Sequence, residues 1–468
     1  MERLMAELRE QIRDKKVMIL GFGREGRSSL KRVLQAGGAA QITIADLNEV
    51  KDAETIRLEA AQQVLHFICG PDYQKCLDDY DLVIKSPGIV LERPWEEYQT
   101  VITSQAELFL KVYGSQVVGI TGTKGKSTTT TLLYHVLKEN GIQAVLMGTI
   151  GIPAFDRLEE MGPDVTVVFE FSCHQLEYNA YSPHRAIYLN LYPEHLDHYG
   201  SFEKYQAAKE NIYRNQRPGD ILYCGRQVLP QEGNHLGEVR VAYPYGERPE
   251  QSEGIWLEEN VIHYVQAGDH DSFAVPTSEI RLMGHHNLYD IAIVYAAVRD
   301  MGVEPEGVLY ALLTYQPLPH RLEYVGTYRD IRFYDDSIST ICETTIQALD
   351  TLPDTGTVLI GGMDRGIEYD DLIHYLAGHT VPHIILMATT GKRMEREIRE
   401  KEPELASSGR IHLVDTLEEA VELAFQLTDP GMACVLSPAA ASYGIFKNFE
   451  ERGDRFQSLV QAGANEAE

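Results

Sequence analysis

Short apolar runs separated by helix-length polar segments recur along the whole chain, and this alternation limits the folds open to it. The runs KVMIL, ITIAD and DLVIK lie within residues 16–85, QVVGIT, VTVVFEF and AIYLNLY within 116–192, and TVLIGG, HIILMA and ACVLSPA within 357–439. Continuous apolar runs of this length are typical of strands that are buried on both faces of a parallel sheet. The sequence therefore predicts an α/β protein.

The alternation restarts twice, which predicts three domains. We expect a Rossmann-like N-terminal domain over residues 1–113, a P-loop-type central ATPase domain over 114–319 and a Rossmann-like C-terminal domain over 320–468. The length of 468 residues agrees, because a domain typically has about 150 residues. Residues 225–280 depart from the pattern: they are rich in Gly, Pro, Gln and Glu, and their pieces IWLEEN and VIHYV predict hairpins.

Charge and composition exclude several classes of partner. The chain has 42 Lys and Arg residues against 70 Asp and Glu, and its net charge of −28 disfavours binding to nucleic acid or anionic lipid over the whole surface. Residues 1–16 lack the apolar core of a signal peptide, and no apolar run is long enough to span a membrane. The six cysteines form no CxxC pair, as expected of reduced thiols. We therefore expect a cytoplasmic protein without membrane insertion or a nucleic-acid partner.

A glycine- and lysine-rich loop directly after QVVGIT is the strongest local signal. It comprises Gly122, Thr123, Lys124, Gly125, Lys126, Ser127 and Thr128. In such a loop backbone N–H groups converge on phosphate oxygens, Lys126 adds positive charge at the outer phosphates, and the Ser127 hydroxyl can hold Mg²⁺. The general P-loop pattern has Gly five residues before Gly125, but Ile120 stands here. We therefore expect a variant ATP-binding loop, followed by a helix that ends near Gly141.

A second glycine-rich turn follows KVMIL. Gly21, Phe22, Gly23, Arg24, Glu25 and Gly26 make a GxGxxG sequence, and Asp46 ends the next run, twenty residues after Gly26. This spacing is typical of dinucleotide sites, in which the turn approaches a pyrophosphate and the acid binds ribose hydroxyls. The diphosphate of a nucleotide other than NAD satisfies the same chemistry, and a GxGxxG can also simply close a strand-to-helix turn.

Three residues beyond the loops are candidates for metal binding or catalysis. Glu170 ends VTVVFE, where a carboxylate next to a P-loop strand is positioned to hold Mg²⁺. His195 follows the next apolar run, and a purely structural role for it stays open. Lys209 lies on a helix predicted over 202–216, three and four residues from Tyr205, Gln206, Ile212 and Tyr213. A lysine on such a half-apolar face either extends its ammonium group to solvent or is kept for chemistry.

Taken together, these segments resemble the Mur ligases. The resemblance rests on TGTKGKST, EFSCHQLE, NLYPEHLDH, YQAAKENIY, MGHHN, LPHRLE, DDS and SPAAASYGIFKNFEERGDRF, which occur in the order of that family and cover essentially the whole chain. It is strongest to the members that join glutamate to UDP-N-acetylmuramoyl-L-alanine. It implies an ATP-dependent, acyl-phosphate-forming ligase of peptidoglycan precursor synthesis, with one domain each for the UDP-substrate, ATP and the amino acid, acting as a monomer.

The resemblance also implies a role for individual residues. Catalysis falls to Lys126, Glu170, His195 and Lys209. The UDP-substrate is bound by Gly21, Phe22, Gly23, Arg24, Glu25, Gly26, Asp46, Ser86, Pro87, Gly88, Thr149, Ser172 and Gln175. ATP is bound by the seven residues from Gly122 to Thr128 together with Asn287, Arg321 and Asp336. Two Mg²⁺ ions are held by Ser127, Glu170, His195 and Lys209, and Lys209 acts as a carbamate formed with CO₂. Glutamate is bound by Thr340, Arg365, Ser442 and Phe449.

The chain departs from the family pattern around the amino acid. Ile338 stands where the family usually has lysine, so the incoming carboxylate loses one expected partner. Arg365 stands about where another lysine is usual, and an arginine can bind a carboxylate bidentately. Thr149 replaces an asparagine. We expect D-glutamate as the substrate, while these changes also resemble a subfamily that adds L-glutamate.

Other functions stay open at this point. Another Mur ligase or a folylpolyglutamate synthetase would share the fold, although the complete GxGxxG domain and the segment FKNFEERGD favour the glutamate-adding members. A non-enzymatic nucleotide-binding regulator would not need Lys126, Glu170, His195 and Lys209 together. A nicotinamide dehydrogenase is the third alternative, and only the GxGxxG turn supports it.

Overall fold

The computed structural model describes residues 1–60, 63–148, 152–231, 233, 235–250 and 253–465. The chain divides into two compact units, one formed by residues 1–280 and 285–315, the other by 281–284 and 316–468. The first unit joins the first two predicted domains, although each of these ranges contains a sheet of its own. The division into three domains at 113/114 and 319/320 therefore stays a prediction.

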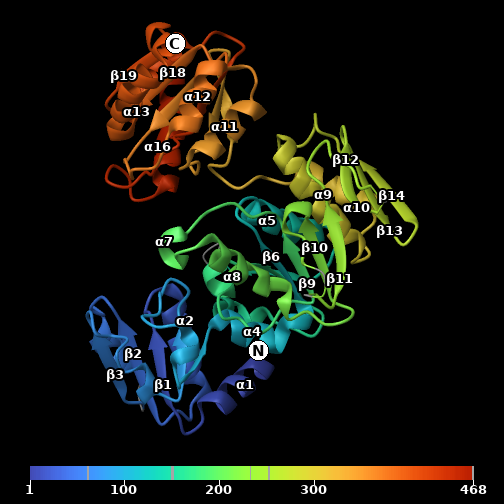
Figure 1. Ribbon diagram of the computed structural model, residues 1–468, viewed down its shortest axis with the longest axis vertical. Helices are drawn as coiled ribbons and strands as arrows, with labels where there is room; N and C mark the ends of the chain where they lie inside the picture. Colours follow the sequence, from blue (N-terminus) through green and yellow to red (C-terminus); the bar gives the residue numbers. More distant parts are fainter. Residues whose placement is uncertain (61–62, 149–151, 232, 234, 251–252, 466–468) are drawn as a thin grey trace. The chain divides into compact units, whose positions relative to one another are not determined.

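The first sheet of unit 1 has five parallel strands in the order β3-β2-β1-β4-β5, with β1 at its centre (Figure 1). This is the order of half a Rossmann fold, and it places the turn after β1 at the middle of the sheet. Its strands are β1 Lys16–Leu20, β2 Gln41–Asp46, β3 Leu65–Cys69, β4 Leu82–Lys85 and β5 Val101–Thr103. Its helices are α1 Glu2–Ile12, α2 Arg24–Ala36, α3 Ala53–Glu59, η1 Leu77–Asp79, η2 Trp95–Glu97 and α4 Gln105–Tyr113.

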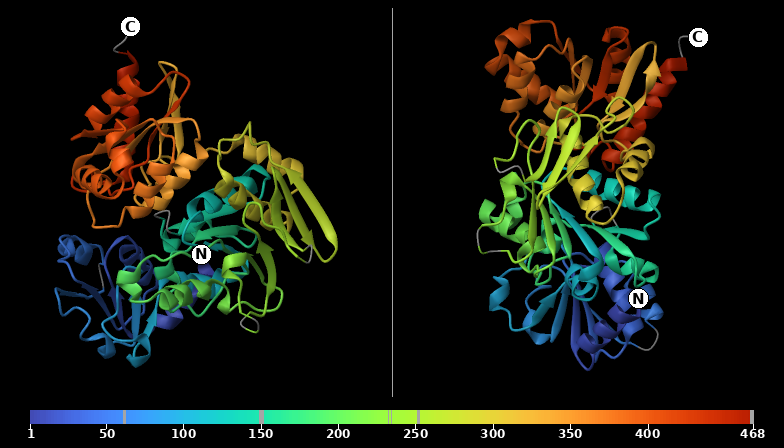
Figure 2. Two further views of the ribbon diagram at one scale, coloured as in Figure 1. Left: turned by 45° about the horizontal axis from the view of Figure 1, so that its top comes forward. Right: turned by 90° about the vertical axis from the view of Figure 1, so that its right-hand side faces the viewer.

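The second sheet of unit 1 has nine strands in the order β14-β13-β12-β11-β10-β9-β6-β8-β7. The strands from β7 to β12 are parallel, and β12, β13 and β14 form two antiparallel hairpins along one edge (Figure 2). The strands are β6 Val117–Thr121, β7 Ala144–Gly148, β8 Thr166–Glu170, β9 Arg185–Tyr188, β10 Ile221–Gly225, β11 Glu238–Ala242, β12 Gly254–Glu258, β13 Val261–Gln266 and β14 Asp269–Ala274. The hairpins predicted between residues 225 and 280 are thus confirmed.

Helices carry the functional loops of this second sheet. They are η3 Gly114–Gln116, α5 Lys126–Glu139, η4 Ala154–Glu160, α6 Cys173–Leu176, α7 Leu196–Tyr199, α8 Phe202–Arg214, η5 Arg226–Val228, α9 His285–Arg299 and α10 Pro305–Thr314. The predicted helix after the lysine-rich loop is α5, and it ends just before Gly141, which has a φ of +74°. The helix predicted over 202–216 is α8, which ends two residues earlier than expected.

Buried polar contacts fasten α2 of the first sheet to η4, which belongs to the second sheet's range. The Arg32 side chain is 1% exposed; its Nε donates to the Phe155 carbonyl at 2.8 Å, and its guanidinium pairs with Glu159. Ser28 Oγ donates to Asp156 at 2.8 Å, and the Phe155 N–H donates to Gln105 Oε1 of α4 at 3.3 Å. These contacts explain why the two sheets of unit 1 form one compact body.

Unit 2 has a six-stranded sheet in the order β15-β16-β20-β17-β18-β19, in which only the edge strand β15 is antiparallel. The strands are β15 Glu323–Tyr328, β16 Ile331–Asp335, β17 Thr355–Gly361, β18 His383–Met387, β19 Ile411–Val414 and β20 Ala433–Leu436. The helices are α11 Cys342–Thr351, α12 Asp370–Gly378, α13 Ala388–Lys401, α14 Pro403–Ser407, α15 Leu417–Leu427 and α16 Phe449–Asn465. Apolar clusters bury both faces of this sheet, as predicted for parallel strands.

Within the described part of the chain, no helix combines the length and the apolar character that a membrane span requires.

Replacing Arg32 with methionine tests the fastening between α2 and η4. Arg32→Met leaves the buried Phe155 carbonyl without its donor, so we expect the free energy of unfolding of unit 1 to fall by about 2–3 kcal/mol. Arg27→Met is the matched control, because Arg27 and Asp52 form a half-exposed surface pair, worth about 1 kcal/mol or less. Urea titration followed by circular dichroism measures both, and equal destabilisation by the two changes would contradict the assignment.

Candidate active site

The lysine-rich loop connects β6 to α5 at the carboxyl end of the second sheet. Gly125, the last residue before α5, has a φ of +82°, and a Cβ atom there would lie 2.7 Å from Asp290 Oδ1. Only glycine fits this position, because both the backbone conformation and the space exclude a side chain. The N-terminus of α5 therefore begins directly at the loop, where its N–H groups favour an anion.

Asn190 shapes the loop from the neighbouring strand. Its Oδ1 accepts hydrogen bonds from the backbone N–H groups of Thr123 at 3.1 Å and Lys124 at 2.8 Å, and its Nδ2 donates to the Lys124 carbonyl. The sequence analysis did not assign a role to Asn190. Its place two residues after β9, which lies beside β6, is the signal that points to it once the strand order is known.

Lys126 and Ser127 open α5 beside Glu170. Lys126 Nζ donates to the Thr123 carbonyl at 2.9 Å, and burial lowers the pKa of this ammonium group despite the nearby Glu170 carboxylate. Ser127 Oγ donates to Glu170 Oε1 at 3.2 Å, because β6 and β8 are neighbours and Ile120 pairs with Glu170. Two of the predicted Mg²⁺ ligands are therefore in direct contact.

Lys209 reaches the same loop from α8. The residue is 1% exposed, and its Nζ donates to the Gly122 carbonyl at 2.6 Å. The ammonium group does not extend to solvent, so that interpretation of the sequence is wrong. Burial, with a smaller contribution from the positive charge of Lys126, lowers the pKa of Lys209 to about 7. A substantial fraction of the amine is therefore neutral near pH 7.

His195 lies next to these residues through Tyr205. The Tyr205 hydroxyl is 3.0 Å from Thr123 Oγ1, and its ring centroid is 5.1 Å from Lys209 Nζ and 6.0 Å from the His195 ring. His195 has a left-handed backbone with a φ of +55° and precedes α7, and its side chain is 45% exposed. The exposed ring thus stands at the solvent side of a buried tyrosine and lysine.

The remaining residues predicted to bind ATP lie in both units. Asn287 is half-buried in the first turn of α9, the helix that packs on α5 and that places Asp290 against Gly125. The sequence analysis missed Asp290. Arg321 and Asp336 belong to unit 2. Asp336 is 6% exposed, accepts hydrogen bonds from Ser437 Oγ and the Leu322 N–H, and has a pKa raised to about 7 by burial.

The GxGxxG turn packs too tightly for side chains at two of its glycines. A Cβ on Gly26 would lie 2.1 Å from the Gly21 carbonyl oxygen, and one on Gly21, which has a φ of +86°, would meet Ile89 and Ser86 below 3.0 Å. Ser86 Oγ donates to the same Gly21 carbonyl at 2.7 Å. The structure thus brings Ser86, and with it Pro87 and Gly88, beside the turn after β1. Gly23 and Arg24, also in the turn, are exposed.

The Asp46 carboxylate holds the glycine-rich turn from the end of β2. Its Oδ2 accepts a hydrogen bond from the Phe22 N–H at 2.6 Å, and its Oδ1 accepts one from the Asn48 N–H at 2.8 Å. A carboxylate that accepts two backbone donors has a fixed orientation at the end of β2. The sequence predicted its position but not that it holds the turn.

Glu25, Gln175 and Lys85 form a polar cluster between the two sheets of unit 1. Gln175 Nε2 donates to Glu25 Oε1 at 3.3 Å, and Ser172 caps α6 by accepting the Gln175 N–H at 3.2 Å. Burial raises the pKa of Glu25 to about 7, although Gln175 and Lys85 oppose the shift. The structure therefore gathers Glu25, Ser172 and Gln175 as predicted. Thr149 lies outside the described residues.

The residues predicted to bind glutamate lie on loops at one end of the unit 2 sheet. Thr340 follows β16, Ser442 follows β20 and Arg365 follows β17, and these three strands are neighbours and parallel. Arg365 is exposed, Ser442 is 4% exposed and Phe449 begins α16. The carboxyl edge of a parallel sheet is where such folds bind ligands.

Arg452, which the sequence analysis missed, holds the loop after β16. It is 2% exposed, and its guanidinium donates to the Ser337 hydroxyl and carbonyl and to the Ala440 carbonyl, at 2.7–3.0 Å. It therefore joins the loop that carries Thr340 to the loop that carries Ser442. Asp364 similarly fixes the turn before Arg365, by accepting the Gly366 N–H and a hydrogen bond from Arg393.

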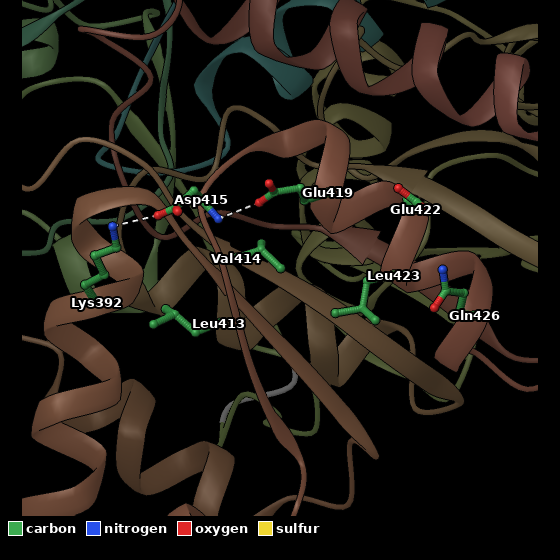
Figure 3. A pocket seen from close by; sticks show the side chains of 8 residues that line it. All are labelled: Lys392, Leu413, Val414, Asp415, Glu419, Glu422, Leu423 and Gln426. Atoms are coloured by element: carbon green, nitrogen blue, oxygen red, sulfur yellow. Dashed lines mark hydrogen bonds and ion pairs between the residues drawn. The ribbon is translucent and has the colours of Figure 1, made fainter.

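Unit 2 also has a pocket that is lined by none of the residues predicted to bind a ligand. It is lined by residues of α13, β19 and α15 together with the loop residue Asp415, and Figure 3 shows Lys392 paired with Asp415 at its rim. Lys392, Leu413, Val414, Asp415, Glu419, Glu422, Leu423 and Gln426 form the lining. None of the predicted site residues is among them.

Comparison with known proteins identifies the family. Residues 120–298 match the Mur ligase middle domain. The chain is 32% identical to a UDP-N-acetylmuramoylalanine–D-glutamate ligase of Trichlorobacter lovleyi over 458 residues, which cover 96% of this chain and 99% of that protein. It is 33% identical to the protein of the same name from Geobacillus kaustophilus, over 95% of this chain and 97% of that protein.

The chain therefore belongs to the Mur ligase family. More particularly, it is a full-length relative of the UDP-N-acetylmuramoylalanine–D-glutamate ligases. Solved structures share its fold: a MurF ligase of Thermotoga maritima in complex with ADP has a TM-score of 0.57 at 16% identity, covering 98% of this chain and 97% of that chain. A MurC of the same organism has a TM-score of 0.55 at 19% identity, covering 96% and 100%.

Glu25→Gln tests the electrostatics of the cluster between the sheets. The folded state raises the pKa of Glu25 from 4.5 to about 7, so it stabilises the protonated form. Stability is therefore lost progressively as the pH rises from about 4.5 to about 7, and the loss is complete above that pH. We expect Glu25→Gln to be about 1–2 kcal/mol more stable than the natural chain at pH 8, and the difference to shrink towards pH 6.

Urea titration at both pH values measures this, with Glu10→Gln on the exposed face of α1 as the control. A stability gain for Glu25→Gln that does not depend on pH would contradict the assignment.

Proposed function

We propose that the chain joins D-glutamate to UDP-N-acetylmuramoyl-L-alanine with hydrolysis of ATP, through an acyl phosphate, in cytoplasmic peptidoglycan precursor synthesis, acting as a monomer. The full-length relatives carry the name of this reaction. The single structural observation that carries the proposal is the meeting of Lys126, Ser127, Glu170 and Lys209 at one phosphate loop. Nucleotide binding alone does not need a buried lysine and a buried carboxylate at the same loop, which disfavours the regulator and dehydrogenase alternatives.

The loop and Lys126 bind and orient the phosphates of ATP. The Thr123 and Lys124 N–H groups are held by Asn190, so the loop is ordered before the nucleotide arrives. Lys126 is partly buried, and its charge stabilises an anion more strongly than a solvated lysine would. We expect Lys126 to neutralise the transferring phosphoryl group as it approaches the alanine carboxylate, an anion that would otherwise repel it.

The residues around Ser127 fit Mg²⁺. Ser127 Oγ and Glu170 Oε1 are 3.2 Å apart, and oxygen donors of this kind are what Mg²⁺ prefers. We assign Ser127, Glu170 and His195 to two Mg²⁺ ions. When bound, Mg²⁺ would offset the negative charges of the phosphates and the carboxylate.

A carbamate on Lys209 would complete this set of ligands. Carbamate formation with CO₂ requires a neutral amine, and the lowered pKa of Lys209 supplies one near neutral pH. The modification turns a cation into a carboxylate, which removes the like-charge repulsion with Lys126 and supplies oxygen donors. The amine is anchored to the Gly122 carbonyl at the phosphate loop itself.

The UDP-substrate is assigned to the first sheet of unit 1, and glutamate is assigned to the sheet of unit 2. The GxGxxG turn with Asp46, Arg24 and Ser86 would bind the UDP moiety, and Ser172 and Gln175 would face the sugar side from α6. Thr340, Arg365, Ser442 and Phe449 would bind the incoming glutamate. Its neutral amine attacks the acyl phosphate, the bond to phosphate breaks, and an amide and inorganic phosphate result.

A second candidate substrate, L-glutamate, is favoured by one observation. Ile338 supplies no charge to the loop after β16, so the exposed Arg365 on the loop after β17 is left to bind a side-chain carboxylate. An arginine at another place in the pocket can orient the opposite enantiomer. The names of the relatives favour D-glutamate.

The substrate assignment is tested by ADP release with each glutamate isomer. With UDP-N-acetylmuramoyl-L-alanine present, we expect ADP and phosphate only when D-glutamate is added, and Arg365→Ala to raise the KM for glutamate about ten-fold or more with a smaller effect on kcat. Lys392→Ala, in the unrelated pocket of the same unit, is the control. Turnover with L-glutamate alone would transfer the proposal to the second candidate, and inactivity with both isomers would overturn it.

Replacing Lys209 tests the carbamate. We expect Lys209→Ala to reduce kcat by about a hundred-fold or more, because it removes a metal ligand, and short-chain carboxylates such as acetate to restore part of the activity. Lys204→Ala, on the exposed face of the same helix, should keep full activity. The intact mass of the natural chain in bicarbonate buffer should rise by one CO₂. An activity loss that no carboxylate alters, together with an unmodified mass, would exclude the carbamate.

A further inference from the structure

A group of metal-binding side chains lies beside the proposed catalytic residues and takes no part in the reaction above. His174, Glu177 and His198 each offer a donor atom, and these three atoms lie within 4.8 Å of one another. His198 Nε2 and Glu177 Oε2 lie 3.2 Å apart. The Glu177 and His198 side chains are only 13% and 10% exposed, so the donors line a sheltered position.

Local structure holds the three side chains in place. His174 and Glu177 are three residues apart on α6 and its C-terminal cap, a spacing that puts them on one face. A capping box between Ser172 and Gln175 fixes the start of this helix. His198 comes from α7, and the next residue, Tyr199, has its hydroxyl 3.3 Å from His174 Nδ1. One ring nitrogen of His174 thus has a hydrogen-bonding partner, as one nitrogen of a metal-bound histidine commonly has.

We infer that His174, Glu177 and His198 form a binding site for Zn²⁺ or a similar borderline transition-metal ion. Two imidazoles and one carboxylate, with a fourth position open to water, are a ligand set that Zn²⁺ commonly takes. Ligands about 2.0–2.1 Å from a tetrahedral ion are about 3.3 Å from each other, which the distance between His198 and Glu177 already matches. Mg²⁺ prefers a set made of oxygens and is not expected here.

Another cation already faces this position. Lys85 Nζ lies 3.9 Å from Glu177 Oε2, the same oxygen that approaches His198. This separation is too long for a hydrogen bond, and Lys85 Nζ lies closer, at 3.4 Å, to the Ser86 and Pro87 carbonyls. Lys85 therefore offsets part of the carboxylate charge without occupying the place between the two imidazoles.

A second group of donors shares His174. Cys173, His174 and His195 also have donor atoms within 4.8 Å of one another. Cys173 is 2% exposed and His195 is a Mg²⁺ ligand under the proposed function, so we assign the site to the other group. The choice between the two groups rests on the proposed function, whereas Zn²⁺ binding itself is measured without any substrate.

The experiment is a titration of the full chain, freed of metal by chelator, with ZnCl₂ in the presence of millimolar MgCl₂. Isothermal calorimetry should show one Zn²⁺ per chain, and the midpoint of thermal unfolding should rise with Zn²⁺ concentration. His174→Asn and His198→Asn should each weaken binding by about ten-fold or more. His66→Asn, an exposed histidine on β3, is the matched control and should bind as the natural chain does.

Co²⁺ substitution identifies the ligands. We expect the intense visible bands of a tetrahedral site without a thiolate charge-transfer band, and Cys173→Ser to leave the spectrum unchanged. Glu177→Gln keeps the side chain's shape and should weaken binding even if the histidine variants do not fold. Absence of Zn²⁺ binding, equal binding by the His174 and His66 variants, or a thiolate band that disappears in Cys173→Ser would each overturn the assignment.

Discussion

The ammonium groups of a buried lysine and a half-buried one donate to consecutive carbonyls of one loop, and the proposed chemistry depends on these two contacts. Lys209 bonds to the Gly122 carbonyl and Lys126 to the Thr123 carbonyl. Like charges in a protein interior are unfavourable unless anions compensate them, and Glu170 supplies only part of the compensation. The loop is thereby prepared for the phosphates of a nucleotide. Carbamate formation on Lys209 would remove one of the two positive charges and with it the repulsion between Lys209 and Lys126.

This local concentration of positive charge stands within a strongly acidic protein. A net charge of −28 repels the anionic substrates of a Mur ligase at long range. Attraction must therefore be short-ranged and come from helix N-termini, glycine-rich turns and a few cations, of which Lys126 and Lys209 are held by backbone carbonyls. Arg32 and Arg452 are not part of this attraction, because each donates to carbonyls in the interior and fastens loops.

Much of the fold and part of the site could be predicted from the sequence, for physical reasons. The strands, α5 and the positions of Gly125, Ser127 and Glu170 follow from local patterns, since the carboxyl ends of neighbouring parallel strands meet. Asn190, Asp290 and Arg452 could not be found in this way, because each acts on residues distant in sequence, and strand order and helix packing are not written in any local pattern. The ambiguity over Lys209 had the same origin: only the path of α8 relative to β6 decides whether its ammonium group is buried.

The close approach of Gly26 to the Gly21 carbonyl has a consequence for how this protein can change over evolution. Helix α2 begins in direct contact with the turn that precedes it, so no side chain can be introduced at that point to adjust the fit to a different nucleotide. Variation in specificity is therefore confined to the ends of β2 and β4 and to exposed positions such as Arg24. Under the proposed function, a lineage would alter which sugar nucleotide it accepts by exchanging those residues, while the backbone of the turn stays the same.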